Sequence, residues 1–248
     1  MARYIKSIEK AGMVLEAFFQ DHELGISEIV EITQLNKSTV FDIVTTLTHM
    51  EYLNQNPVTK RYYLGIKLFE LGNLYIKRNP LKNRSEPYAN QLAKKYNATI
   101  HLATFDKGEV VYIEKYMHPD AFVNYSQAGK RAPLTCTGVG KAMLAQLSDE
   151  YKNEFVYSKP LAQLTNKSIT DKEVLENDLA LTRQRGYAID DEEIELGLKC
   201  VAAPIFNENG EIIAAMSVSK LAPSMTEDTI PVIAEQLIKA TKAISYVS

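Results

Sequence analysis

The sequence predicts an α+β protein built in two parts. Apolar residues recur at helical spacing three times before residue 50, and two short strand-like runs follow them. Beyond residue 80, longer strand-like runs are combined with helical segments at the start, in the middle and at the end. With 248 residues, 46% of them hydrophobic, the chain is long enough to bury two separate cores.

The first part begins with an amphipathic helix from Ile5 to near Asp21, because its apolar residues fall three to four positions apart. A short helix around residues 26–30 follows, and residues 34–36 interrupt the pattern in a tight turn. Asn36 is predicted to cap the next helix, since its side-chain oxygen can accept a bond from a first-turn amide. The apolar face of that helix consists of Val40, Ile43, Val44 and Leu47.

The opposite face of this third helix is polar and rich in hydroxyl groups. Small hydroxyl side chains and a lysine near a helix N-terminus suit close approach to phosphates and base edges of DNA. An ordinary solvated helix face would show the same spacing, and the pattern alone does not separate the two interpretations. The candidate DNA-contacting residues on this helix are Lys37, Ser38, Thr39, Phe41, Asp42 and Thr45.

Two short strands, at residues 52–55 and 61–64, are predicted around a turn at residues 56–60. Three helices followed by a hairpin give the order of a winged helix-turn-helix. Lys60 and Arg61 lie at this hairpin, where basic side chains could neutralise phosphates without reading sequence, or could simply be solvated surface. Any DNA binding must be local, because the chain carries a net charge of −3.

A connecting helix is expected from Gly65 to Arg78, ending at Asn79 because a residue before proline disfavours the helical region. The sequence therefore divides into a winged helix-turn-helix at residues 1–65, a linker helix at 66–80 and a second domain at 81–248.

The second domain is predicted to be a mostly antiparallel sheet flanked by helices. A capping box at Thr170–Glu173 would open its middle helix, and Gly186 would close that helix. Hairpin turns are expected at residues 106–108 and 207–210. The expected helices are 86–96, the one closed by Gly186, and 230–244, and the expected strands are 98–104, 110–116, 187–189, 200–206 and 211–219.

Several motifs resemble the IclR family of bacterial transcriptional regulators. Residues 35–40, Leu47, residues 51–53 and residues 63–65 resemble its winged-helix module, although Asn36 stands where proline is common and Phe41-Asp42 where a more basic pair is common. Three further blocks resemble its effector-binding domain, which has a GAF-like fold: residues 131–142, 186–200 and 202–219. The resemblance implies a DNA-binding regulator, more often a repressor, that acts as a homodimer or dimer of dimers on a palindromic operator of double-stranded DNA.

The resemblance also implies a pocket for a small organic acid. Ser217 and Ser219, two apart on one strand, would point the same way, and Asp190 would accept bonds from the ligand. The glycine turn at residues 138–142 is not a nucleotide-binding P-loop, because Thr135 and Ala142 replace its Gly and its Ser or Thr. It could present amides to a carboxylate or simply start a helix. The implied pocket residues are Gly138, Val139, Asp190, Leu198, Cys200, Ser217 and Ser219.

Two other classes of function were weighed. Cys200 could be a nucleophile, but no histidine is placed by a recognisable motif to act as its base, and a buried cysteine is more often a small hydrophobe. A winged-helix adaptor that binds proteins would fit the balanced charge of the N-terminal part. We expect no catalytic residues, no cofactor and no metal site, since Cys136 and Cys200 form no CxxC pair. No run approaches the roughly 18 apolar residues of a membrane span, so a soluble, cytoplasmic protein is expected.

Overall fold

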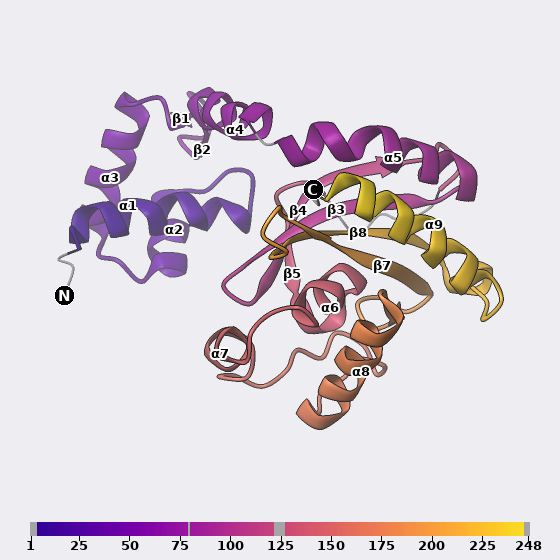
Figure 1. The fold of residues 1–248 in the computed structure, drawn as a ribbon. Coiled ribbons are helices and arrows are strands. Elements are labelled where there is room, and N and C mark those ends of the chain that lie inside the picture. Colours follow the sequence, from indigo (N-terminus) through magenta and orange to yellow (C-terminus); the bar gives the residue numbers. More distant parts are fainter. Residues whose placement is uncertain (1–3, 79, 122–126, 246–248) are drawn as a thin grey trace. The chain divides into compact units, whose positions relative to one another are not determined.

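The computed structural model describes residues 4–78, 80–121 and 127–245, and the chain separates into two compact units, residues 1–79 and 80–248 (Figure 1). In the described ranges, no helix combines the length and apolarity needed to cross a membrane.

The N-terminal unit is a winged helix-turn-helix followed by one further helix. Its first helix ends at Glu16, earlier than expected, and a 3₁₀ turn at Ala17–Phe19 tightens the segment that follows. Its elements are α1 (Lys6–Glu16), α2 (Ile26–Thr33), α3 (Lys37–His49), β1 (Leu53–Gln55), β2 (Tyr62–Leu64) and α4 (Ile66–Arg78). The elements before α4 enclose a core that includes Val14, Phe18, Leu24, Ile29, Val40, Val44, Leu47, Leu53 and Tyr62.

The predicted cap of α3 is confirmed. The Asn36 side-chain oxygen accepts a bond from the Thr39 amide at 2.8 Å, and Gln34 in the turn before it adopts a left-handed conformation with φ of 57°. Val40, Val44 and Leu47 are buried, as the apolar spacing predicts. The cap therefore fixes where α3 begins and which of its faces is turned to solvent.

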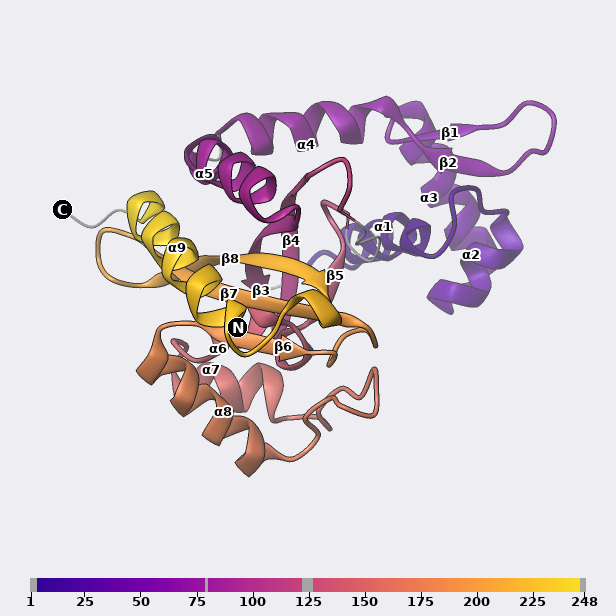
Figure 2. The same ribbon diagram turned by 90° about the vertical axis from the view of Figure 1, so that its right-hand side faces the viewer.

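The C-terminal unit contains one six-stranded antiparallel sheet in the order β5-β4-β3-β8-β7-β6. Helices α5 and α9 cover one face of the sheet, and α6 and α8 lie on the other (Figures 1 and 2). Its strands are β3 (Thr99–Asp106), β4 (Glu109–Met117), β5 (Arg131–Pro133), β6 (Ala188–Asp191), β7 (Leu198–Phe206) and β8 (Ile212–Leu221). Its helices are α5 (Pro80–Tyr96), α6 (Gly138–Leu144), α7 (Asp149–Tyr151), α8 (Lys172–Arg185) and α9 (Thr229–Ile244).

Two expectations about the helices of this unit are wrong. Helix α5 begins at Pro80, not near Glu86, because proline fits the first helical position, where no amide bond is lost. The capping box at Thr170 does not form: Asp171 caps α8 instead, and its side chain accepts a bond from the Val174 amide at 2.9 Å. The end of α8 at Gly186, with φ of 81°, is as predicted.

Candidate effector pocket and DNA-reading helix

The exposed face of α3 carries the residues predicted to contact DNA. Lys37, Ser38, Phe41, Asp42 and Thr45 are exposed, and Thr39 is half-buried. The Ser38 hydroxyl donates to the Asn36 side chain at 3.0 Å, and the Thr45 hydroxyl donates to the Phe41 carbonyl at 2.8 Å. Both hydroxyl oxygens keep lone pairs that can accept further bonds.

The two basic residues predicted at the hairpin have different environments. Lys60 is exposed, with φ of 59°. Arg61 instead folds back onto its own unit, where its guanidinium donates to the Glu23 carbonyl at 2.8 Å and to the Glu28 carboxylate at 2.9 Å. The bond from the Gly25 amide, followed by that from Arg61, lowers the pKa of Glu28. Arg61 therefore attaches the wing to α2.

All seven predicted effector residues line one cavity between α6 and the sheet. About 20 Å³ of it admits a water-sized sphere, which is roughly the room for one water molecule, so the walls lie close together. Four further residues, not predicted from the sequence, complete the lining. The cavity is formed by His101, Tyr112, Thr137, Gly138, Val139, Asp190, Ile194, Leu198, Cys200, Ser217 and Ser219.

Strand register brings the polar lining residues into adjacent rows. Asp190 pairs with Cys200, and Cys200 pairs with Ser219, so these three side chains form one row across β6, β7 and β8. Ser217 pairs with His101 in the next row, across β8 and β3. Side chains two positions apart share a face of a strand, and both rows therefore face α6.

A cluster of one imidazole and two hydroxyls lies at the centre of this surface. The His101 Nδ1 atom lies 3.2 Å from the Ser219 Oγ and 3.4 Å from the Ser217 Oγ, and the two Oγ atoms are 3.5 Å apart. Burial, reinforced by the charge of Lys115, lowers the pKa of His101 to about 3. The imidazole is therefore neutral at physiological pH and offers hydrogen bonds without a charge.

Asp190 is 1% exposed and has two unlike oxygens. Its Oδ1 accepts a bond from the Glu193 amide at 2.8 Å. Its Oδ2 has no hydrogen-bond partner among the described residues. Burial, offset in part by that amide, raises the pKa of Asp190 to about 7. This carboxyl group can accordingly carry a proton near neutral pH.

Cys200 is a poor candidate for a nucleophile. Burial, and secondarily the neighbouring Asp190, raise the pKa of its thiol well above the ordinary value. A thiol must ionise to attack, and this environment opposes ionisation. Cys200 therefore contributes a small, neutral side chain to the cavity wall.

A buried ion cluster supports the cavity from behind. The Lys141 Nζ on α6 contacts the Glu193 carboxylate and lies 2.8 Å from the Asp178 Oδ2 on α8. The Ser168 hydroxyl donates to the Glu193 carbonyl at 2.7 Å. These bonds hold the loop after β6, and with it the amide that orients Asp190.

His101 and Tyr112 were the main pocket residues that sequence reasoning missed. Both lie on strands that were predicted, and His101 is two residues from Thr99 on the same face. The signals that would have found them are the pairing of β3 with β8, for His101, and the pairing of β4 with β3, for Tyr112. No local pattern in these strands encodes either pairing.

The comparisons with known proteins agree with this geometry. The family model described as "Bacterial transcriptional regulator IclR C-terminal" matches residues 73–246, and the one described as "IclR helix-turn-helix domain" matches residues 7–57. The chain is 34% identical to the HTH-type transcriptional regulator XynR of Escherichia coli K12, over 97% of this chain and 96% of that protein. It is 31% identical to the regulator KdgR of the same organism, over 97% and 92%.

One solved structure that resembles this chain contains a bound ligand. An IclR homologue from Microbacterium hydrocarbonoxydans, solved with 4-hydroxybenzoate, has a TM-score of 0.82 and 26% sequence identity, covering 96% of this chain and 98% of that one. The two family models together span nearly the whole chain, in the order in which the two units occur. The chain therefore belongs to the IclR family of transcriptional regulators, with a helix-turn-helix DNA-binding domain and a C-terminal ligand-binding domain.

Proposed function

We propose that this protein is a repressor that binds a palindromic operator through α3 and whose operator binding is controlled by a small organic acid in the cavity. The observation that carries the proposal is the cavity itself, in which Asp190 from β6 converges with Ser217 and Ser219 from β8, two strands that the sheet brings together. Two relatives, at 28% identity, are named the transcriptional repressor IclR and the acetate operon repressor.

The DNA-reading part of the proposal rests on the solvated face of α3. Its first turn presents Lys37, Ser38 and Thr39 next to the capped N-terminus, where recognition helices approach the bases. The wing would add Lys60 as a phosphate contact that does not depend on sequence.

The organic-acid part rests on the chemistry of the cavity lining. Hydroxyls, a neutral imidazole and a protonatable carboxyl suit the hydroxyl or keto end of an oxygen-rich acid. Tyr112, Val139 and Leu198 supply apolar walls that would suit an aromatic acid, and the homologue solved with 4-hydroxybenzoate makes this second class worth testing.

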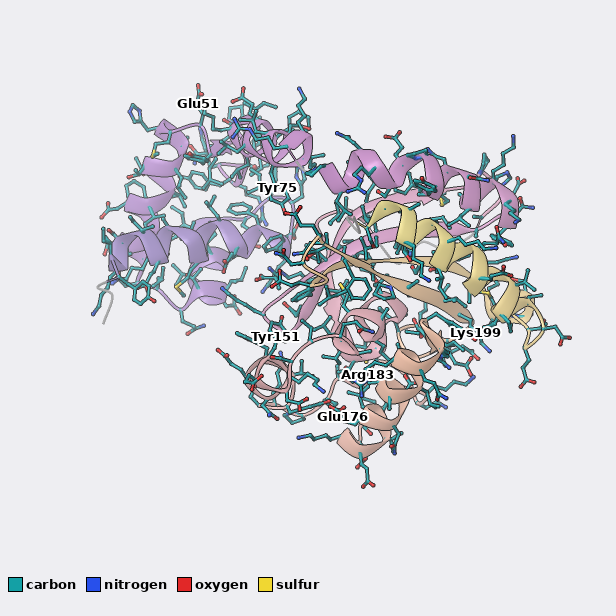
Figure 3. All side chains as sticks on the ribbon, in the orientation of Figure 1. Glu51, Tyr75, Tyr151, Glu176, Arg183 and Lys199 are labelled. Atoms are coloured by element: carbon teal, nitrogen blue, oxygen red, sulfur yellow. The ribbon has the colours of Figure 1, made fainter. Side chains whose placement is uncertain are left out.

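A homodimer or dimer of dimers would suit the exposed apolar side chains of α4. No residue of α4 is buried, and Phe69 and Tyr75 are 66% and 67% exposed. Tyr75 is labelled in Figure 3. Patches of this kind on a small unit mark association sites, and two copies would place two α3 helices on half-sites roughly 34 Å apart.

The decisive experiment measures operator binding with and without a bound effector. Thermal-shift screening against keto acids, sugar acids and aromatic acids would identify a ligand, and a gel shift on genomic fragments would then be run with and without it. We expect a salt-dependent specific complex that the ligand weakens. A protein that binds a partner protein but no DNA fragment at low salt would instead be an adaptor.

Removing the hydroxyls of Ser38 and Thr39 tests whether the exposed face of α3 binds DNA. Ser38→Ala with Thr39→Ala should weaken operator binding and leave effector binding unchanged. Thr48→Ala, which removes a half-buried hydroxyl bonded to the Val44 carbonyl at the other end of α3, is the control. Equal affinity in the double variant and the control would reject the assignment.

A further inference from the structure

The cavity has an unusual charge balance for a site that would receive an acid. Its lining contains one carboxyl group, Asp190, and no lysine or arginine. His101, on β3, is kept neutral by its burial. In the row that runs from Asp190 across β7 and β8, the next two side chains are the Cys200 thiol and the Ser219 hydroxyl, which carry no positive charge.

Lys141, the cation that lies behind the lining, is already paired with carboxylates. Lys141, from α6, is 1% exposed and contacts two carboxylates, those of Glu193 and Asp178. Arg185 lies 3.7 Å from the same Asp178 and therefore belongs to the same cluster. The two cations and the two carboxylates of this cluster balance one another, so it has no positive charge to spare for a ligand.

An acid anion placed beside an ionised Asp190 would add a second negative charge to a closed, buried space. Two carboxylates that share such a site cannot both ionise without a large penalty, so one of them retains a proton. The proton has a defined place, because Oδ1 of Asp190 already accepts the Glu193 amide and Oδ2 is without a partner among the described residues.

We propose that the effector is a monocarboxylate that enters the cavity together with one proton, which Asp190 holds on Oδ2 and donates in a hydrogen bond to the effector. This inference rests on the proposed acid-sensing function and makes it more specific. It predicts rejection of dicarboxylates, because no cation in the lining could balance a second charge. The pKa of Asp190, raised to about 7 by burial, makes proton uptake possible at neutral pH.

Calorimetry at pH 6.0, 7.0, 8.0 and 8.5 tests the inference, with 4-hydroxybenzoate and 2-oxobutanoate as probes. Benzene-1,4-dicarboxylate and 2-oxoglutarate are their matched dicarboxylates. We expect the affinity for a monocarboxylate to fall about tenfold per pH unit above about pH 7, since each binding event then takes up a proton. Titrations at pH 8.0 in two buffers of different ionisation enthalpy should show about one proton taken up.

Asp190→Asn is the most informative variant. Its side-chain oxygen can still accept the bond from the Glu193 backbone amide, and its NH2 group is a permanent donor in place of Oδ2. Its affinity should be independent of pH and should exceed that of the parent at pH 8.5. His101→Asn, which replaces the lining imidazole by a group that does not titrate, should retain the pH dependence of the parent.

The outcomes separate this inference from the function on which it rests. Binding of a monocarboxylate without pH dependence, a pH dependence that persists in Asp190→Asn, or equally tight binding of the dicarboxylates would overturn the inference alone. Failure of these probes and of the whole acid panel to bind at pH 6.0 would reject the acid-sensing function and this inference together.

Discussion

The guanidinium of Arg61 at the base of the wing lies 2.9 Å from the carboxylate of Glu28 on α2. Because of this pair and the bond from Arg61 to the Glu23 carbonyl, the neighbouring basic residues Lys60 and Arg61 have different surroundings. Lys60 is exposed to solvent, and Arg61 holds the hairpin against α2.

Lys60→Gln should lower operator affinity equally for all sequences and reduce the salt slope by about one unit, because one phosphate contact is lost. Its thermal stability should match that of the parent. Arg61→Gln should lower the melting temperature, and Glu28→Gln, which keeps an oxygen for the Gly25 amide, should reproduce that loss with the salt slope unchanged. Gel shifts at several salt concentrations and thermal melts measure both effects. A Lys60→Gln variant with the parent salt slope would contradict this division.

Asn36→Ala should destabilise the N-terminal unit by about 1 kcal/mol, because the Thr39 amide loses its acceptor. Asn36→Asp retains the oxygen and should be close to the parent in urea unfolding. If the alanine variant unfolded at the same urea concentration as the parent, the cap would contribute nothing to the stability of α3.

Lys141→Met should be strongly destabilising although the two side chains are similar in shape, because it removes the one cation that contacts both the Glu193 and the Asp178 carboxylates. Arg185, 3.7 Å from Asp178, would remain beside that carboxylate alone. Removing one partner of a buried ion pair costs about 3–5 kcal/mol. Adding Glu193→Gln to Lys141→Met should recover part of the loss. Urea unfolding followed by circular dichroism compares the three proteins, and a double variant no more stable than the single one would argue against this electrostatic explanation.

The stability of the C-terminal unit should depend on pH through Asp190. Its pKa is near 3.8 in an unfolded chain and about 7 when folded, so between these values the folded protein holds a proton that the unfolded chain has lost. Stability therefore falls as pH rises through this window, by about 4 kcal/mol in all, and this contribution is constant above about pH 7.

Asp190→Asn should remove that slope, so its advantage over the parent should grow from pH 4 to pH 7. His101 acts in the opposite sense: its pKa of about 3 in the folded protein makes stability rise from about pH 3 to its ordinary value of 6.5. The comparison is accordingly made between parent and variant at each pH, by urea unfolding. A constant difference across the window would contradict the raised pKa.

Two glycines at the start of α6 should respond differently to alanine. A Cβ at Gly140 would lie 2.3 Å from the Leu134 carbonyl oxygen, so Gly140→Ala should disrupt the fold of the unit. A Cβ at Gly138 would lie 3.3 Å from Ala202 and 3.4 Å from Cys200, at the cavity wall. Gly138→Ala should therefore leave melting nearly unchanged while weakening ligand binding in calorimetry. Unaltered ligand affinity would place the ligand away from this wall.

Local patterns predicted most of the elements, β5 and α7 excepted, but not the pairing of the strands. The alternation along β8 correctly placed Ser217 and Ser219 on one face, since strand geometry has a fixed period of two. Nothing in the sequence near His101 indicates that it pairs with Ser217, because register between distant strands depends on the whole sheet. For the same reason the contact of Arg61 with Glu28, from different elements, was not foreseen.

The pairing of β3 with β8 also has a consequence during protein synthesis. His101 and Ser217 are 116 residues apart, so the pocket is left half-built until the ribosome has made nearly all of the chain. At common translation speeds this interval lasts roughly 10 s. The N-terminal unit, which has its own core within residues 14–62, can fold throughout that time. A nascent or truncated regulator would thus have a folded DNA-binding unit before it has a complete ligand cavity.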